Sequence, residues 1–125
     1  MDFHRHQATV TPLAIEDAAQ GFAACGAESR LTVLRLLVRA GEGGLTVGQV
    51  QERTGFPAST LAHHLRFLTA GGLVEQERQG RTVINRAAYG QIEALAAFLI
   101  DECCADAMPS AQAQAARAAL RSPAL

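Results

Sequence analysis

Residues 45–70 read LTVGQVQERTGFPASTLAHHLRFLTA, and this stretch decides the fold. It predicts two short helices with a tight break between them. Thr46 can cap the first helix, over residues 47–54, and Gly55 can end it. Phe56 and Pro57 then make the turn. A glycine pair after Ala70 ends the second helix, so the stretch has the organisation of a helix-turn-helix.

The second of these helices has one apolar side and one polar side. Leu61, Leu65 and Leu68 recur at i, i+4 and i+7, which places them on one stripe that can pack inward. The opposite arc carries Ser59, Thr60, His63 and Arg66. Short polar groups, a ring donor and a guanidinium on an exposed helix suit the DNA major groove. The alternative is an ordinary solvated helix face.

Two strand-like runs follow, over residues 73–78 and 81–86, with alternating character. Gln79 and Gly80 form the predicted turn, because glycine can adopt the positive φ that tight hairpins need. Arg78 and Arg81 would then lie at the hairpin tip, within reach of a phosphate backbone or a minor groove. A hairpin directly after a helix-turn-helix is a wing. The alternative is an ordinary surface hairpin.

The remaining patterns predict helices over residues 13–25, 27–40 and 89–104. We expect the apolar side of the second to comprise Leu31, Val33, Leu34, Leu37 and Val38, and the inward residues of the short helix after it to be Leu45, Val47 and Val50. The last helix has more apolar surface than one small domain needs, which suggests a second copy of the chain as partner.

The predicted fold class is therefore mainly α with a small β-hairpin, a winged helix-turn-helix. We expect a flexible segment over 1–11, one winged DNA-binding and dimerisation domain over 12–106, and a C-terminal tail or short helix over 107–125.

Composition sets the broad limits. The chain has 125 residues, of which 49% are hydrophobic, with a formal net charge of −1. It has neither a secretory signal pattern nor an apolar run that could cross a membrane, so we expect a cytoplasmic protein whose three cysteines are reduced thiols. The charge permits DNA binding without requiring it, because basic residues cluster in the middle of the chain.

Four motifs together resemble the ArsR/SmtB family of winged-helix repressors: GAESRLTVLRLL (26–37), STLAHHLRFL (59–68), AGGLV (70–74) and QERQGRTV (76–83). The resemblance implies a homodimer formed through the first and last helices. It also implies that the second helix of each helix-turn-helix, the recognition helix, enters the major groove. The two recognition helices of the dimer would occupy successive major grooves of a palindromic operator in double-stranded DNA. The ligand-free dimer would repress transcription, and an inducer would lower its affinity for DNA.

The same resemblance implies roles for individual residues. Ser59, Thr60 and His63 would read base edges, whereas Arg66 and the two wing arginines, Arg78 and Arg81, would hold phosphates. His64 would be mainly structural or would touch a phosphate.

The last helix indicates what is sensed. It contains no histidine, so the histidine–carboxylate sites of the family's zinc and nickel sensors are not expected. Cys103 and Cys104 are adjacent, and vicinal thiols favour soft, thiophilic species. The pair resembles the arsenic-responsive members of the family, with a trivalent arsenical as inducer and no required cofactor. Side chains of consecutive helical residues diverge by about 100°, so both sulfurs reach one atom only where the helix end distorts.

Several alternatives remain open at the level of sequence. Cys25 either completes a three-sulfur site suited to arsenite, or leaves a two-sulfur site that prefers methylarsenite. The chain could instead sense reactive sulfur or oxidants, with Cys25 and Cys104 forming a disulfide. A winged-helix module that binds another protein is a further alternative. A thiol enzyme is disfavoured, because no histidine base lies on the same element as the thiol pair and the neighbouring carboxylates would raise the thiol pKa.

Overall fold

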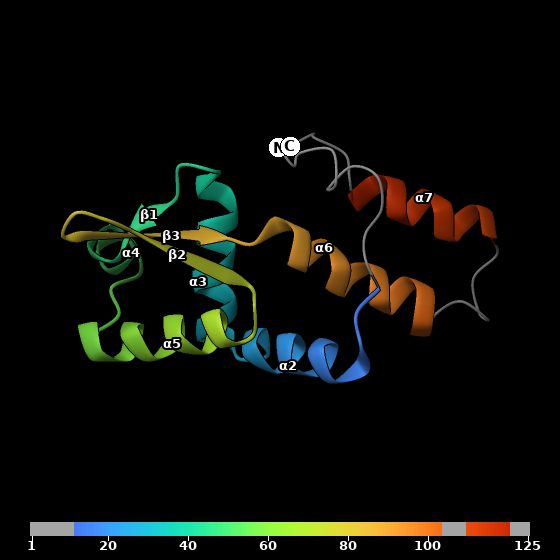
Figure 1. Ribbon diagram of the computed structural model, residues 1–125, viewed down its shortest axis with the longest axis horizontal. Helices are drawn as coiled ribbons and strands as arrows, with labels where there is room; N and C mark the ends of the chain where they lie inside the picture. The colour runs from blue at the N-terminus through green and yellow to red at the C-terminus, as the bar shows by residue number, and fades with distance from the viewer. Residues whose placement is uncertain (1–11, 104–109, 121–125) are drawn as a thin grey trace. The chain divides into compact units, whose positions relative to one another are not determined.

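The computed structural model describes residues 12–103 and 110–120. Its elements run in the order α2 (Ile15–Cys25), α3 (Glu28–Ala40), β1 (Leu45–Thr46), α4 (Val47–Thr54), α5 (Ala58–Ala70), β2 (Val74–Gln79), β3 (Thr82–Ala87), α6 (Tyr89–Phe98), the π-helix η1 (Leu99–Cys103) and α7 (Ser110–Leu120) (Figure 1). The chain divides into two compact units. We call Ala19–Tyr89 the winged unit, and Met1–Ala18 together with Gly90–Leu125 the terminal unit.

The winged unit contains the predicted helix-turn-helix. Helix α4 begins with a capping box, in which the Thr46 hydroxyl accepts a hydrogen bond from the Gln49 backbone N–H and the Gln49 side chain accepts one from the Thr46 N–H. These two bonds satisfy backbone donors that a helix start otherwise leaves without partners. Gly55 ends α4 in the left-handed conformation, and α5 follows after a short turn, as the sequence predicted.

The small sheet has three antiparallel strands in the order β1-β3-β2, one strand more than predicted. The added strand, β1, is two residues long and pairs Leu45 with Asn85 and Thr46 with Ile84. The expectation that Leu45 belongs to the inward side of a helix was wrong, because this residue is buried in the sheet instead. A two-residue strand is too short to show the alternation by which strands are recognised in a sequence.

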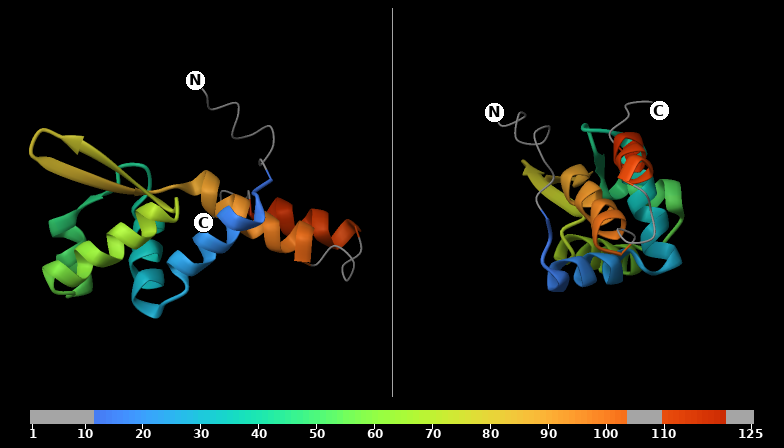
Figure 2. Two further views of the ribbon diagram at one scale, coloured as in Figure 1. Left: turned by 60° about the horizontal axis from the view of Figure 1, so that its bottom comes forward. Right: turned by 90° about the vertical axis from the view of Figure 1, so that its right-hand side faces the viewer.

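The hairpin β2–β3 is present, with its turn displaced by one residue from the prediction. Gln79 pairs with Thr82 as the last rung of the ladder, so the turn residues are Gly80 and Arg81. Gly80 has a φ of 65°, which confirms that the turn uses a backbone conformation available mainly to glycine. In two views the hairpin tip and the N-terminal end of α5 lie at the same end of the winged unit (Figures 1 and 2).

Helix α3 contacts both α5 and β3, and its buried residues are Val33, Leu34 and Leu37. Leu31 and Val38, which the pattern had placed on the same apolar side, are exposed. The apolar residues of this helix cover a wider arc than the one that its packing partners bury. The core of the winged unit also includes Leu45, Val50, Leu61, Leu65, Leu68, Leu73 and Val74.

The terminal unit contains most of α6, then η1 and α7. The predicted helix over 89–104 is present as far as the structure describes it, although it is an α-helix only to Phe98 and a π-helix from Leu99 to Cys103. The sequence left open whether the C-terminal segment is a tail or a short helix, and in the structure Ser110–Leu120 form the helix α7. Arg117 of this helix forms an ion pair with Asp101. No helix in the described ranges is both long and apolar enough to span a bilayer.

Candidate nucleic-acid interface

Helix α5 is held by its leucine stripe. Leu61 and Leu68 are 0% exposed and Leu65 is 3% exposed, so the predicted inward face is confirmed. Burying three leucine side chains contributes roughly 5–9 kcal/mol of hydrophobic free energy before entropy costs are subtracted. That burial fixes the rotation of the helix about its axis, and therefore determines which side chains face outward.

The outward face carries the four predicted DNA-reading side chains. Ser59, Thr60, His63 and Arg66 are all exposed. They come from the first, second and third turns of the helix, and the N-terminal turns of a recognition helix are those that approach base edges. The structure therefore brings these four residues to one surface, while their roles toward DNA stay a prediction.

Two further residues, which the sequence analysis did not identify, adjoin this face, one directly and one through the other. The ring of Phe67 lies 4.8 Å from the His63 ring, at an interplanar angle of 79°. The guanidinium carbon of Arg30 lies 4.5 Å from the centroid of the Phe67 ring. The i, i+4 spacing of His63 and Phe67 could have shown their contact, whereas the approach of Arg30 depends on tertiary structure.

His64 differs from His63 in its surroundings. It is half-buried, its ring packs edge-on against Phe56 with 5.5 Å between centroids, and its buried Nδ1 has no hydrogen-bond partner among the described residues. Burial is the main reason that the pKa of His64 is lowered, and the charges of Arg30 and His63 lower it further. A neutral packing role agrees better with this geometry than a charged phosphate contact.

The hairpin supplies the two remaining predicted contacts. Arg78 and Arg81 are exposed near its tip. At its base Arg86 bonds the Glu77 carboxylate at 2.6 Å and donates from Nε to the Glu42 carbonyl at 2.7 Å. This ion pair offsets one of the negative charges on the hairpin, which favours approach to a phosphate backbone.

The hairpin is also anchored through a buried amide. Asn85 is fully buried, donates from Nδ2 to the Leu45 carbonyl at 3.2 Å and accepts a bond from Gln76 Nε2 at 2.7 Å. A buried side-chain amide needs such partners, and these tie the middle strand β3 to both of its neighbours. The orientation of the wing base is therefore fixed by polar contacts in addition to the backbone ladder.

The structure describes two of the three cysteines that were predicted to form the thiol site. Cys25 is half-buried in the winged unit, Cys103 is exposed at the end of η1 in the terminal unit, and both are free thiols. Cys104 lies outside the described residues. Among the residues that the structure does describe, no three His, Cys, Asp or Glu side chains gather as metal ligands would. The role of the thiols stays a prediction.

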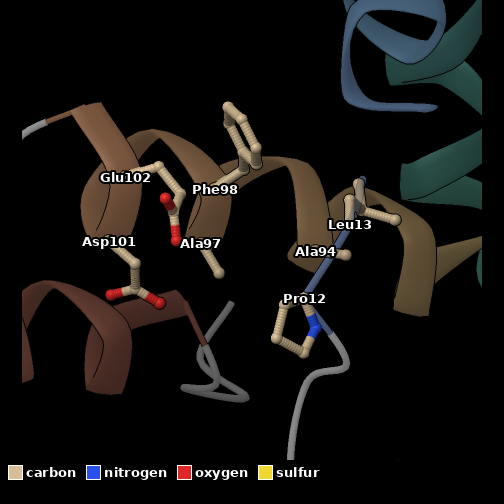
Figure 3. A pocket seen from close by; sticks show the side chains of 7 residues that line it. All are labelled: Pro12, Leu13, Ala94, Ala97, Phe98, Asp101 and Glu102. Atoms are coloured by element: carbon tan, nitrogen blue, oxygen red, sulfur yellow. The ribbon is translucent and has the colours of Figure 1, made fainter. Parts of the chain in front are cut away.

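One small hollow lies in the terminal unit (Figure 3). It has a volume of about 60 Å³ and is lined by Pro12, Leu13, Ala94, Ala97, Phe98, Asp101 and Glu102. This is well below the several hundred Å³ of a typical small-molecule site. Neither of the two described cysteines lines it.

The fold and the exposed face of α5 define a class, the winged helix-turn-helix transcriptional regulators. A family model described as "Helix-turn-helix domain" matches residues 26–77. Over 65 residues the chain is 35% identical to an uncharacterized HTH-type transcriptional regulator of Methanocaldococcus jannaschii, an alignment that covers 52% of this chain and 71% of the relative.

Solved structures agree with this class. An ArsR-like transcriptional regulator from Rhodococcus sp. RHA1 is 25% identical, with a TM-score of 0.66 over 88% of this chain and 97% of that one. The homodimeric winged helix-turn-helix DNA-binding domain of a possible ArsR-family regulator from Mycobacterium bovis is 27% identical, with a TM-score of 0.56 over 74% of this chain and 81% of that one. The chain therefore belongs to the helix-turn-helix transcriptional regulators, a DNA-binding class, and its fold is similar to that of ArsR-like winged-helix regulators.

Proposed function

We propose that this chain is a cytoplasmic transcriptional repressor that binds double-stranded operator DNA as a homodimer. One observation carries the DNA-binding mode: the N-terminal end of α5 and the hairpin tip lie at the same end of the winged unit (Figure 1), and the predicted DNA-contacting side chains on both are exposed. Ser59, Thr60 and His63 read base edges in the major groove, and Arg66 holds a phosphate. The hairpin arginines, Arg78 and Arg81, hold phosphates beside the helix.

The homodimer is supported by two features. The relative from Mycobacterium bovis is homodimeric. In the terminal unit, Ile15 is 68% exposed and Leu99 is 45% exposed, which is apolar surface that a second copy of the chain would cover. A two-fold dimer would present two copies of α5 to two half-sites of a palindrome.

Selection of duplexes from a random pool tests this part of the proposal. The full-length protein should retain palindromic sites and bind them at least a hundredfold more tightly than an unrelated duplex at the same salt concentration. Ser59→Ala and His63→Ala should lower the affinity for the selected site and leave the affinity for the unrelated duplex unchanged. A protein that retains no duplex at low salt would instead be a winged-helix module for a protein partner.

We further propose that a trivalent arsenical is the inducer and that Cys103 and Cys104 are its ligands. The support comes from the chemistry of adjacent thiols and from the exposure of Cys103.

Titration of the protein–DNA complex with arsenite and, separately, with methylarsenite tests the inducer. Release should be abolished in Cys103→Ser and in Cys104→Ser, both of which should still bind DNA. Cys25→Ser is the matched variant that also lacks one thiol. If arsenite needs three sulfurs, this variant should no longer release DNA with arsenite but should still release it with methylarsenite. If two sulfurs suffice, both compounds should release DNA as they do from the wild-type protein. Normal release from both vicinal variants would exclude the pair. If persulfide or peroxide releases the DNA, and the mass of the protein changes as cysteine oxidation requires, the signal is redox instead.

A further inference from the structure

Arg30 connects the ends of three helices. It lies in the first turn of α3, donates from Nε to the Ala24 carbonyl at 2.6 Å and donates from Nη2 to the Ala23 carbonyl at 3.1 Å. These carbonyls belong to the last turn of α2, where a helix has acceptors without intrahelical partners and a partial negative charge. Two bonds from one planar guanidinium fix its position and its orientation.

The same guanidinium covers the ring of Phe67 on α5. The distance from its carbon to the ring centroid is 4.5 Å, within the range of a cation–π interaction. Phe67 is 44% exposed, so burial alone does not restrict its rotamer. An anchored cation above one face of the ring supplies the restriction that burial does not.

Phe67 in turn contacts the proposed base reader His63. The two rings meet edge to face at 4.8 Å, an arrangement favoured by the ring quadrupole. A continuous series of contacts therefore runs from the last turn of α2, through Arg30 and Phe67, to the imidazole of His63.

The last turn of α2, whose carbonyls hold Arg30, is packed closely against the end of α5. A Cβ placed on Gly71, directly after α5, would lie 2.5 Å from the Ala24 Cβ and 3.3 Å from the Gln20 carbonyl. The last turns of α2 therefore touch the end of α5 with no space for a methyl group. Because the carbonyls that hold Arg30 belong to this same contact, the guanidinium has a fixed position above Phe67.

We propose that Arg30 and Phe67 are positioning residues that set the orientation of the His63 ring for base recognition. Neither needs to touch DNA: Arg30 fixes Phe67, and Phe67 fixes the imidazole. This inference rests on the proposed DNA-reading role of α5 and adds two residues that determine its specificity.

A double-mutant cycle on the selected duplex tests the proposal. Phe67→Leu keeps apolar bulk but removes the ring, and should lower the affinity for the selected site about three- to tenfold. Its affinity for an unrelated duplex and its salt dependence should not change, because no charge is lost. In a His63→Ala background, Phe67→Leu should have no further effect, since its action passes through His63. Equal losses in both backgrounds would overturn the proposal.

Arg30→Gln tests the first link, with Arg35→Gln as a matched control that removes an exposed arginine from the same helix. Arg30→Gln should weaken the selected site more than the control does, and this excess should disappear in the Phe67→Leu background. Equal effects of the two variants would contradict a positioning role.

The free protein gives a readout that needs no DNA. In proton NMR spectra, the His63 ring protons should show a ring-current shift that is lost in Phe67→Leu, reduced in Arg30→Gln and retained in Arg35→Gln. Unchanged His63 signals in Arg30→Gln would refute the proposed link even in a protein that binds DNA well. Failure of the wild-type protein to bind any duplex would instead refute the DNA-binding function, so the two failures are distinguishable.

Discussion

Adding one methyl group at Gly71 should lower the stability of the winged unit. The backbone of Gly71 has a φ of −81° and a ψ of 0°, which alanine adopts without strain. The only obstacle is space, because the new Cβ would lie 2.5 Å from the Ala24 Cβ. Overpacking of this kind costs about 1–3 kcal/mol. For a chain of this size we expect the melting temperature of Gly71→Ala to fall by roughly 4 °C for each kcal/mol.

Urea unfolding and thermal melting of Gly71→Ala measure this effect against two comparisons. Gly43 has nothing within 4 Å of its Cβ position, so Gly43→Ala should change the free energy of unfolding by no more than about 0.5 kcal/mol. Ala24→Gly alone should cost about 0.5–1 kcal/mol, as glycine does in a helix. Combined with Gly71→Ala it should restore stability, because the colliding methyl is gone. A Gly71→Ala protein as stable as the Gly43→Ala control, or simply additive losses in the double variant, would refute the reasoning.

Three other predictions concern the cap, the DNA contacts and the half-buried histidine. Thr46→Ala removes the capping box of α4 and should lower the free energy of unfolding by about 0.5–2 kcal/mol; an unchanged urea midpoint would count against it. Arg66→Ala should weaken all duplexes similarly and reduce the slope of log affinity against log salt by about one, whereas an unchanged slope would mean that Arg66 holds no phosphate. The lowered pKa of His64 means that the folded state binds fewer protons than the unfolded state between that pKa and the ordinary value of about 6.5. The free energy of unfolding should therefore fall as the pH drops from 7 through this interval, and this part of the pH dependence should disappear in His64→Gln. A wild-type protein whose stability rises over the same interval would contradict this assignment.

The parts of the fold that depend on local patterns could be predicted from sequence. The stripe of Leu61, Leu65 and Leu68, the cap at Thr46 and the glycine in the hairpin turn each reflect a preference of a few neighbouring residues. Their positions in the structure agree with those preferences, and the outward face of α5 follows from the buried one.

The parts that depend on tertiary contacts could not be predicted. Strand β1 exists because Leu45 pairs with Asn85, and Leu31 is exposed because the arc that α3 buries is set by its packing partners. The π-helix at Leu99–Cys103 leaves no mark in the spacing of apolar residues. Arg30 reaches Phe67 only because α2, α3 and α5 meet, so the proposed positioning of His63 is visible in the structure alone.

The central claim is that the outward face of α5 and the tip of the hairpin form the DNA-binding surface. The most direct test follows backbone amide NMR signals while a selected operator duplex is added to the full-length protein at low salt. We predict that the largest shifts fall on Ser59, Thr60, His63 and Arg66 and on the hairpin residues Arg78 and Arg81. Shifts concentrated on α7 or on the exposed side of α3, with these six residues unaffected, would contradict the claim.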